Sequence, residues 1–201
     1  MVKSTISELQ GLFTKAGQLL STLSHILPDQ YMQTLESLQD DAPASPFEET
    51  KALIEKELNG TINSLFRSFE SVPIASASIG QVYSATMNSG EHVAVKVQHS
   101  NIEELAKADL VIIEKLIKRV SYFVKFQGIE HVYSQVKIMI QEELDYEKEA
   151  NSMNQISANI ADVEGVMIPE VFASHSTKRI LTTKFEEGTK ITNVAQLDEW
   201  N

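Results

Sequence analysis

The sequence predicts an α+β fold in which helices pack around a small antiparallel sheet. Apolar residues recur at spacings of three and four over much of the chain, as in amphipathic helices. Two segments, 79–85 and 92–97, instead alternate with period two and are rich in β-branched residues. The turn sequence Asn88-Ser89-Gly90 separates them. These two segments therefore predict a β-hairpin within a largely helical chain.

The remaining elements follow from the same patterns and from helix-ending residues. Helices are expected over residues 4–25, 28–38, 47–58, 101–126 and 132–159, with a short helical piece through Leu65 and Phe69. Two prolines in 40–46 indicate a loop, and Asn59-Gly60 favours the end of the third helix. A last pair of strands is expected at about 170–173 and 179–185.

Composition excludes several classes of function. The chain has 201 residues, 42% of them apolar, a formal charge of −11 and no cysteine. The lack of cysteine excludes disulfides, thiolate metal sites and thiol nucleophiles. The five histidines lack metal-ligand spacing, so no metal site is expected. The excess of negative charge disfavours nucleic acid as a partner.

The chain lacks the sequence features of a membrane-spanning or secreted protein. No run of about 18 apolar residues occurs, and the segment before Glu8 lacks the apolar stretch of a secretory signal. A cytoplasmic location is therefore predicted. Contact with the periphery of a membrane stays open.

Lys96 is the first candidate for chemistry. In the strand Val93-Ala94-Val95-Lys96, the alternation places Lys96 on the face opposite the valines. Taken alone, a lysine at the end of an apolar strand is usually a solvated edge residue. Upstream, however, residues 75–81 form a run of small side chains that lets backbone N–H groups approach a phosphate. The order of loop, strand, hairpin and V-A-x-K lysine matches the arrangement in protein kinases.

An acidic run at 142–149 could supply a partner for this lysine. On a regular helix Asp145 and Glu149 share a face, whereas Glu143 lies on nearly the opposite one. By itself such a run is most often a solvated helix face. In kinases, however, a glutamate on the long helix after the lysine strand holds the lysine, so in company with Lys96 this run becomes a candidate charge relay.

Together these segments resemble the UbiB family of atypical kinases, also called the AarF or ADCK group. Lys15-Ala16-Gly17-Gln18 resembles the family's KxGQ motif, and residues 38–43 resemble its LQDxxPP stretch. The segment 73–83 is similar to its alanine-rich nucleotide loop. Glu143-Leu144-Asp145 resembles its ExD motif, with Glu149 at the position of the lysine's partner. In this order the motifs are highly specific, and they cover roughly residues 10–190.

The resemblance implies a site for adenine nucleotide and a division of the chain. Residues 1–70 would form an N-terminal helical extension that carries KxGQ, and residues 71–201 a kinase-like N-lobe that ends just after the hinge. The implied nucleotide-site residues are Lys96, Ala75, Ser76, Ala77, Ser78, Gly80, Gln81, Glu149, Lys15, Gln18, Glu143 and Asp145. The implied cofactor is ATP, with Mg²⁺ expected only in a complete two-lobed protein.

Two departures limit what the resemblance implies. Lys184 stands near the hinge where an acidic residue is usual. The sequence also contains no catalytic-loop Asp and Asn motif and no metal-binding D-F-G. No catalytic residue is therefore assigned, and the chain alone is not expected to transfer a phosphoryl group.

The leading functional hypothesis is the ATP-binding N-lobe of a UbiB-like atypical kinase or ATPase. The resemblance links it to ubiquinone or other isoprenoid-quinone biosynthesis, with a lipid or proteins of that pathway as partners. The alternative is a noncatalytic, pseudokinase-like interaction module that binds a partner or a lipid. A third hypothesis is that the chain is a fragment of a longer enzyme.

Overall fold

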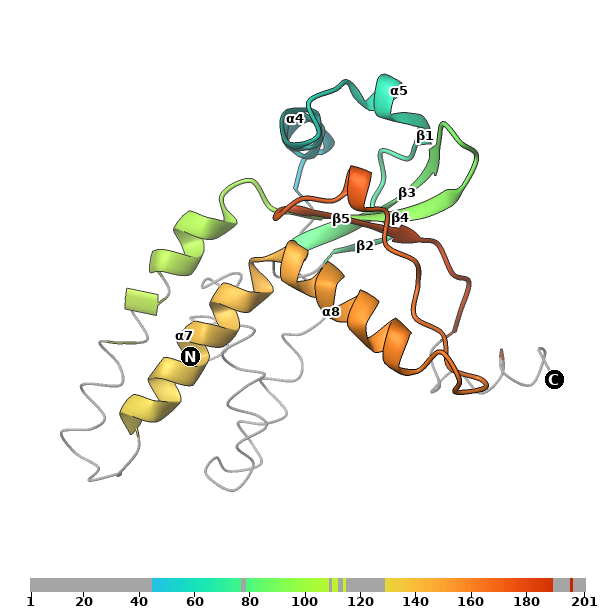
Figure 1. Cartoon of the computed structure of the whole chain (residues 1–201). Coiled ribbons are helices and arrows are strands. Elements are labelled where there is room, and N and C mark those ends of the chain that lie inside the picture. The colour runs from blue at the N-terminus through green and yellow to red at the C-terminus, as the bar shows by residue number, and fades with distance from the viewer. Residues whose placement is uncertain are drawn as a thin grey trace.

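The computed structural model describes residues 45–76, 79–108, 110–111, 114, 129–189 and 196. This part of the chain combines helices with a small antiparallel sheet (Figure 1), which confirms the predicted α+β class. The helices expected at 4–25 and 28–38, and most of the one expected at 101–126, lie outside the described residues. None of the helices searched in the described part is long and apolar enough to cross a bilayer.

A long hairpin forms the centre of the sheet. Strand β3 (Gly80–Met87) pairs antiparallel with β4 (His92–Gln98), from Gly80 opposite Gln98 to Thr86 opposite His92. The turn between them contains Gly90 at φ +107°, a conformation that glycine adopts without strain. The hairpin predicted around Asn88-Ser89-Gly90 is thus confirmed.

Three further strands extend this hairpin on its two sides. The sheet order is β1-β3-β4-β5, and β2 also pairs with β3. Strands β1 (Phe66–Phe69) and β2 (Ala75–Ser76) pair with opposite ends of β3, because Phe66 lies opposite Met87 and Ala75 opposite Val82. Strand β5 (Ile180–Lys184) pairs with β4, so Lys96 lies opposite Leu181.

Side chains alternate between the two faces of β4, and an apolar cluster lies on each face of the sheet. Val93, Val95 and Val97 are fully buried in a cluster that includes Leu53 and Ile54 of helix α4 (Phe47–Glu57). Figure 1 shows α4 on one side of the sheet and α7 and α8 on the other. The second cluster joins the sheet to those two helices and consists of Ile79, Ile102, Ala106, Ile140, Leu144, Tyr146 and Leu181.

The chain before β1 folds differently from the sequence prediction. Helix α4 ends as expected, with Asn59 at φ +53°, but α5 covers only Ile62–Leu65 and is followed directly by β1. The predicted helical piece through Phe69 is therefore wrong. A register shift between Phe66 and Ser68 places Phe66 and Phe69 in the same cluster, with ring centroids 5.3 Å apart. Such a bulge mimics the spacing of a helix. The domain boundary at residue 70 stays a prediction, although β1 already belongs to the sheet.

The helix expected over 132–159 is divided in two. Helix α7 (Ile129–Glu143) ends before Leu144, and α8 (Tyr146–Asn159) begins after Asp145, whose carboxylate accepts a hydrogen bond from Lys148 N at 3.2 Å. Leu144 and Tyr146 are both buried in the second cluster. Residues two apart do not share a face of a continuous helix, so burying both side chains requires the break.

The final pair of predicted strands is only half present. Strand β5 is confirmed, but the segment at 170–173 forms a single bridge, from Val171 to Thr183. The chain then turns into the 3₁₀ helix Ala173–His175. Thr182 Oγ1 donates to the carbonyl of His175 at 2.6 Å and so satisfies a group in this turn.

A buried polar group connects α4 to β3. Thr50 Oγ1 accepts hydrogen bonds from Gln81 Nε2 at 2.8 Å and from Tyr83 Oη at 3.2 Å. Gln81 is only 1% exposed, and its side chain also bonds the backbone of Ser45, with Oε1 accepting from N at 3.1 Å. A buried donor that loses its acceptor carries its full desolvation cost.

We therefore expect Thr50→Val to lower the free energy of unfolding by about 2 kcal/mol, because two buried donors lose their acceptor. Urea denaturation measures this change. Thr86→Val is the matched control, since the half-buried Thr86 alternates on β3 with the buried Ala85 and Met87. Equal stability of the two variants would contradict the role of Thr50.

Candidate nucleotide-binding site

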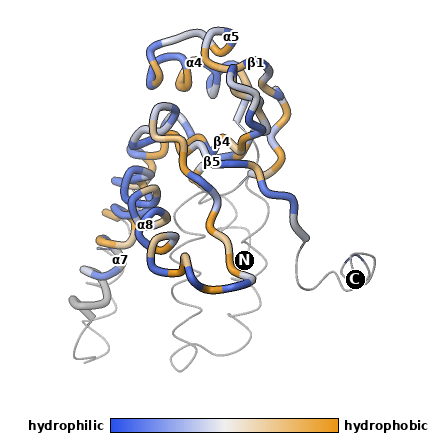
Figure 2. The backbone as a smooth tube through the Cα atoms, turned by 45° about the vertical axis from the view of Figure 1, so that its right-hand side comes forward, coloured by the Kyte–Doolittle hydropathy of each residue, from blue (hydrophilic) through white to orange (hydrophobic). Residues whose placement is uncertain are grey.

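A cavity of about 810 Å³ lies where β4 meets α7 and α8. Its walls carry three glutamates and two lysines, so both signs of charge are present. The described residues that line it are Lys96, Met139, Glu142, Glu143, Lys148, Glu149, Asn151, Ser152 and Gln155. Figure 2 shows hydrophilic and hydrophobic positions interspersed along α7 and α8, as expected for helices with one face in the core.

Lys96 and Glu149 form an ion pair in this cavity. Lys96 Nζ lies 2.8 Å from Glu149 Oε1 and 2.7 Å from Oε2. The pairing predicted from the sequence is thus confirmed. The two side chains are 31% and 40% exposed, and pairs as exposed as this contribute about 0–1 kcal/mol to stability. The main consequence of the contact is to hold the ammonium group in one place.

The aromatic ring of Tyr146 contacts the same ammonium group. Lys96 Nζ lies 4.5 Å from the centroid of the Tyr146 ring, within the range of a cation–π contact. Tyr146 is 1% exposed. Burial raises the pKa of its hydroxyl well above the usual value, and the negative charges of Glu149 and Glu143 raise it further. The ring therefore stays neutral at any physiological pH.

The small-residue segment forms a tight connection into β3. Ala75 and Ser76 pair with Val82 and Gln81, while Ala77 and Ser78 lie outside the described residues. A Cβ atom at Gly80 would lie 2.4 Å from the carbonyl oxygen of Val97, which only glycine avoids. The hydroxyl of Ser76 is buried and has no hydrogen-bond partner in the part of the chain that the structure describes. Glycine at position 80 is therefore explained by the close approach of β3 to β4.

The other predicted site residues occupy different positions. Glu143 lines the cavity, but Asp145 caps α8 and is not part of the lining. The expectation that Asp145 and Glu149 share one face of a continuous helix is corrected by the break at Asp145. The side chain of Gln81 is engaged within the core rather than exposed toward a ligand. Lys15 and Gln18 lie outside the described residues.

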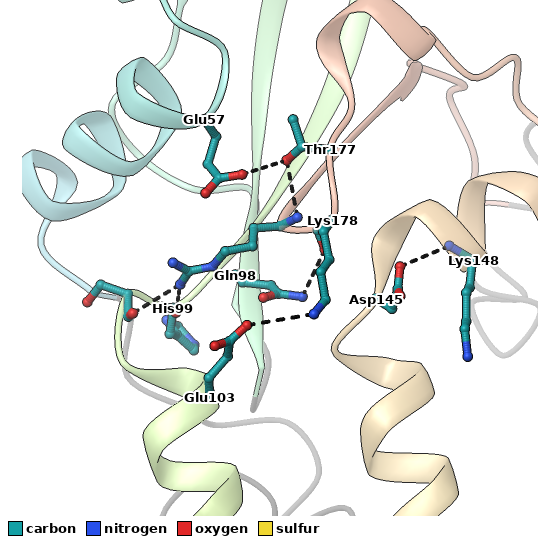
Figure 3. A network of polar contacts seen from close by, with 10 residues as sticks. Glu57, Gln98, His99, Glu103, Asp145, Lys148, Thr177 and Lys178 are labelled. Atoms are coloured by element: carbon teal, nitrogen blue, oxygen red, sulfur yellow. Dashed lines mark hydrogen bonds and ion pairs between the residues drawn. The ribbon is translucent and has the colours of Figure 1, made fainter.

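A polar network that sequence reasoning missed joins α4, the end of β4 and the segment before β5 (Figure 3). Thr177 Oγ1 donates to Glu57 Oε2 of α4 at 3.1 Å, and Gln98 Nε2 donates to the carbonyl of Lys178 at 3.4 Å. Lys178 Nζ also lies 4.0 Å from Glu103 Oε1. These partners are 75 to 120 positions apart in the chain, so no local pattern indicates them.

Lys184, which stands near the hinge where the family usually has an acidic residue, is paired with a neighbouring carboxylate. Lys184 Nζ pairs with Glu186 Oε1 at 3.2 Å. The next residue, Phe185, donates its backbone N–H to the carbonyl of His92 at 2.9 Å and stacks on the His92 ring at 4.3 Å. The lysine is thus neutralised by a neighbour, and the segment after β5 is fixed to the start of β4.

Residues 37–201 match the ABC1 atypical kinase-like domain. The chain belongs to the ABC1 atypical kinase-like family. This ABC1-family chain is 38% identical over 184 residues to a Dictyostelium discoideum protein named "Probable serine/threonine-protein kinase abkD", covering 92% of this chain and 26% of that protein. It is 31% identical to the mouse AarF domain-containing protein kinase 1, covering 94% of this chain and 36% of the relative.

A solved structure shares the fold of this ABC1-family chain. It is the Mycobacterium tuberculosis protein Rv3197, determined in complex with erythromycin, with a TM-score of 0.64 and 30% sequence identity. The match covers 96% of this chain and 49% of that one. The chain therefore spans about half of the solved relative, and 26% and 36% of the two curated relatives above. The resemblance to AarF-type kinases and the kinase-like fold are both confirmed.

The raised pKa of Tyr146 predicts a loss of stability at alkaline pH. The folded chain keeps this hydroxyl neutral while the unfolded chain ionises it near pH 10. The stabilisation is complete below that pH and is lost as pH rises through the range up to the folded pKa, by at most about 1.4 kcal/mol per pH unit. In Tyr146→Phe this part of the decline should vanish, whereas the contribution of Tyr83, whose pKa is also raised, remains. Unfolding curves between pH 9 and 11 test this, and identical slopes for both proteins would refute it.

Proposed function

We propose that this chain binds ATP as the nucleotide-binding N-lobe of an atypical kinase. The observation that carries the proposal is the position of Lys96, whose ammonium is held by Glu149 and Tyr146 in a cavity of about 810 Å³. A fixed cation suits phosphate oxygens, since charge-assisted hydrogen bonds are among the strongest that proteins make. By the family resemblance, backbone N–H groups of the small-residue segment would contact the same phosphates.

Each part of the nucleotide has a proposed place. The phosphates lie between Lys96 and the small-residue loop, and adenine lies against the backbone of the hinge after β5, as the family resemblance implies. Among the described residues no group of three or more His, Cys, Asp or Glu side chains could hold a metal ion.

The role of the whole protein is a further proposal. By resemblance to UbiB-type kinases, a complete protein would use ATP in the metabolism of ubiquinone or another isoprenoid quinone. Lipid or proteins of that pathway would be its partners, at the periphery of a membrane facing the cytoplasm. The support is family membership, including the AarF-type relative.

Nucleotide titration of the purified chain tests the binding proposal. Lys96→Ala should weaken ATP binding about tenfold or more, because a charge-assisted contact worth about 1.5–3 kcal/mol is lost. It should change the free energy of unfolding by less than about 1 kcal/mol, as expected for an exposed ion pair. Calorimetry and urea denaturation measure the two quantities.

Lys56→Ala is the matched control for charge. Lys56 is exposed on α4, the helix packed against the opposite face of β4 from Lys96. Its removal should change ATP affinity less than twofold. Equal losses in both variants would show that only net charge matters, and no binding by the unaltered chain would favour the interaction-module alternative.

We also expect the chain to release no phosphate from ATP. The sequence contains no catalytic-loop Asp and Asn motif and no D-F-G, and phosphoryl transfer depends on such groups to hold Mg²⁺ and orient the nucleophile. A sensitive phosphate-release assay with Mg²⁺ present provides the measurement. Turnover that disappears in Lys96→Ala would contradict the expectation, whereas turnover that survives in Lys96→Ala would indicate a contaminant.

A further inference from the structure

Tyr146 touches two parts of the proposed site that come from different strands. Its ring lies under the ammonium of Lys96 on β4, with 4.5 Å between Nζ and the ring centroid. Its hydroxyl lies against Gly80 at the start of β3. The contact is so close that a Cβ atom added to Gly80 would lie only 3.0 Å from Tyr146 Oη. One side chain thus spans from the end of the small-residue loop to the lysine.

The environment of the Tyr146 hydroxyl is unusual for a purely structural tyrosine. The oxygen is buried and has no hydrogen-bond partner among the described residues. A buried tyrosine usually finds such a partner, and an unsatisfied hydroxyl costs free energy. The hydroxyl therefore makes no hydrogen bond that explains this side chain, whereas its aromatic face contacts a cation.

The backbone of Tyr146 fixes where its ring lies. Its N–H donates to the carbonyl of Lys178 at 3.0 Å, and Asp145 before it caps α8. Glu149, the anion that pairs with Lys96, is on the first turn of the same helix. The start of α8 therefore presents an anion and an aromatic face to one ammonium group.

We propose that Tyr146 is a positioning residue for ATP binding, which holds the ammonium of Lys96 in place for the phosphates through its ring. This inference rests on the proposed nucleotide function. In this role Glu149 binds the ammonium group of Lys96, and the ring of Tyr146 restricts the positions that this group can take. Without the ring, the ammonium keeps its anion but samples more positions, and phosphate binding weakens.

A double-mutant cycle separates this role from simple core packing. ATP affinity is measured by titration calorimetry for the full 201-residue chain and for Tyr146→Phe, Tyr146→Leu, Lys96→Ala and the Tyr146→Leu/Lys96→Ala double variant. Tyr146→Leu should weaken binding roughly fivefold, as expected for a cation–π contact that is partly exposed to solvent. Tyr146→Phe keeps the ring and should stay within twofold. In the Lys96→Ala background, Tyr146→Leu should have no further effect.

Ile140→Ala provides the control for destabilisation. Ile140 is buried in the same apolar cluster but belongs to α7. It should lower stability in urea at least as much as Tyr146→Leu and leave ATP affinity within twofold. Circular dichroism confirms that each variant is folded before titration.

The outcomes distinguish the positioning role of Tyr146 from the proposed ATP binding on which it rests. Binding that depends on Lys96, combined with a Tyr146→Leu effect that is equal in both backgrounds, would overturn the positioning role and leave the proposed function standing. A fivefold loss in Tyr146→Phe would also overturn it, because the ring is retained. No ATP binding by the unaltered chain would overturn both.

Discussion

The break between α7 and α8 is the constraint on which the site depends. Leu144 and Tyr146 both enter the apolar cluster beneath the sheet, and this is possible only because the helix stops between them. The freed backbone is then satisfied by the Asp145 cap and by the hydrogen bond from Tyr146 N to the carbonyl of Lys178. Glu149 lies on the first turn of the new helix and contacts Lys96 of β4. Packing of two apolar side chains thus determines where a charged pair forms.

Stability and chemistry come from different parts of this structure. The core consists of two apolar clusters and one satisfied polar group around Thr50, all nearly inaccessible to water. The Lys96–Glu149 pair is partly exposed and contributes little to folding. Its residues are therefore free to interact with a ligand without a large effect on the fold. This separation is what makes affinity and stability independent measurements in the variants of Lys96.

The sequence predicted the elements whose signals are local. The alternation of β4 placed Lys96 opposite the buried valines, and Asn59 ended α4 in the left-handed conformation that Asn tolerates. The break at Asp145 also left a local signal, since Asp is a good cap and Leu144 and Tyr146 are two apart, but the surrounding helical spacing concealed it. The bulge at Phe66–Ser68 imitated a helix in the same way. The burial of Gln81 could not be predicted, because its partners Ser45 and Thr50 are more than thirty positions away.

The charged side chains that line the cavity determine how strongly it can attract an anion. Three glutamates and two lysines line it, and the ammonium of Lys96 is already neutralised by Glu149. Lys148 is less tightly held, since its Nζ lies 4.0 Å from Glu142 and both side chains are more than half exposed. At such a distance in water a unit charge pair is worth only about 1 kcal/mol, so Lys148 can reorient toward an anion at little cost. Lys96, whose ammonium is shared with Glu149, and the more loosely held Lys148 are the two cations that line the cavity. Because each of these lysines lies near a carboxylate, the position in which the Lys96 ammonium is held matters more here than the number of lysines.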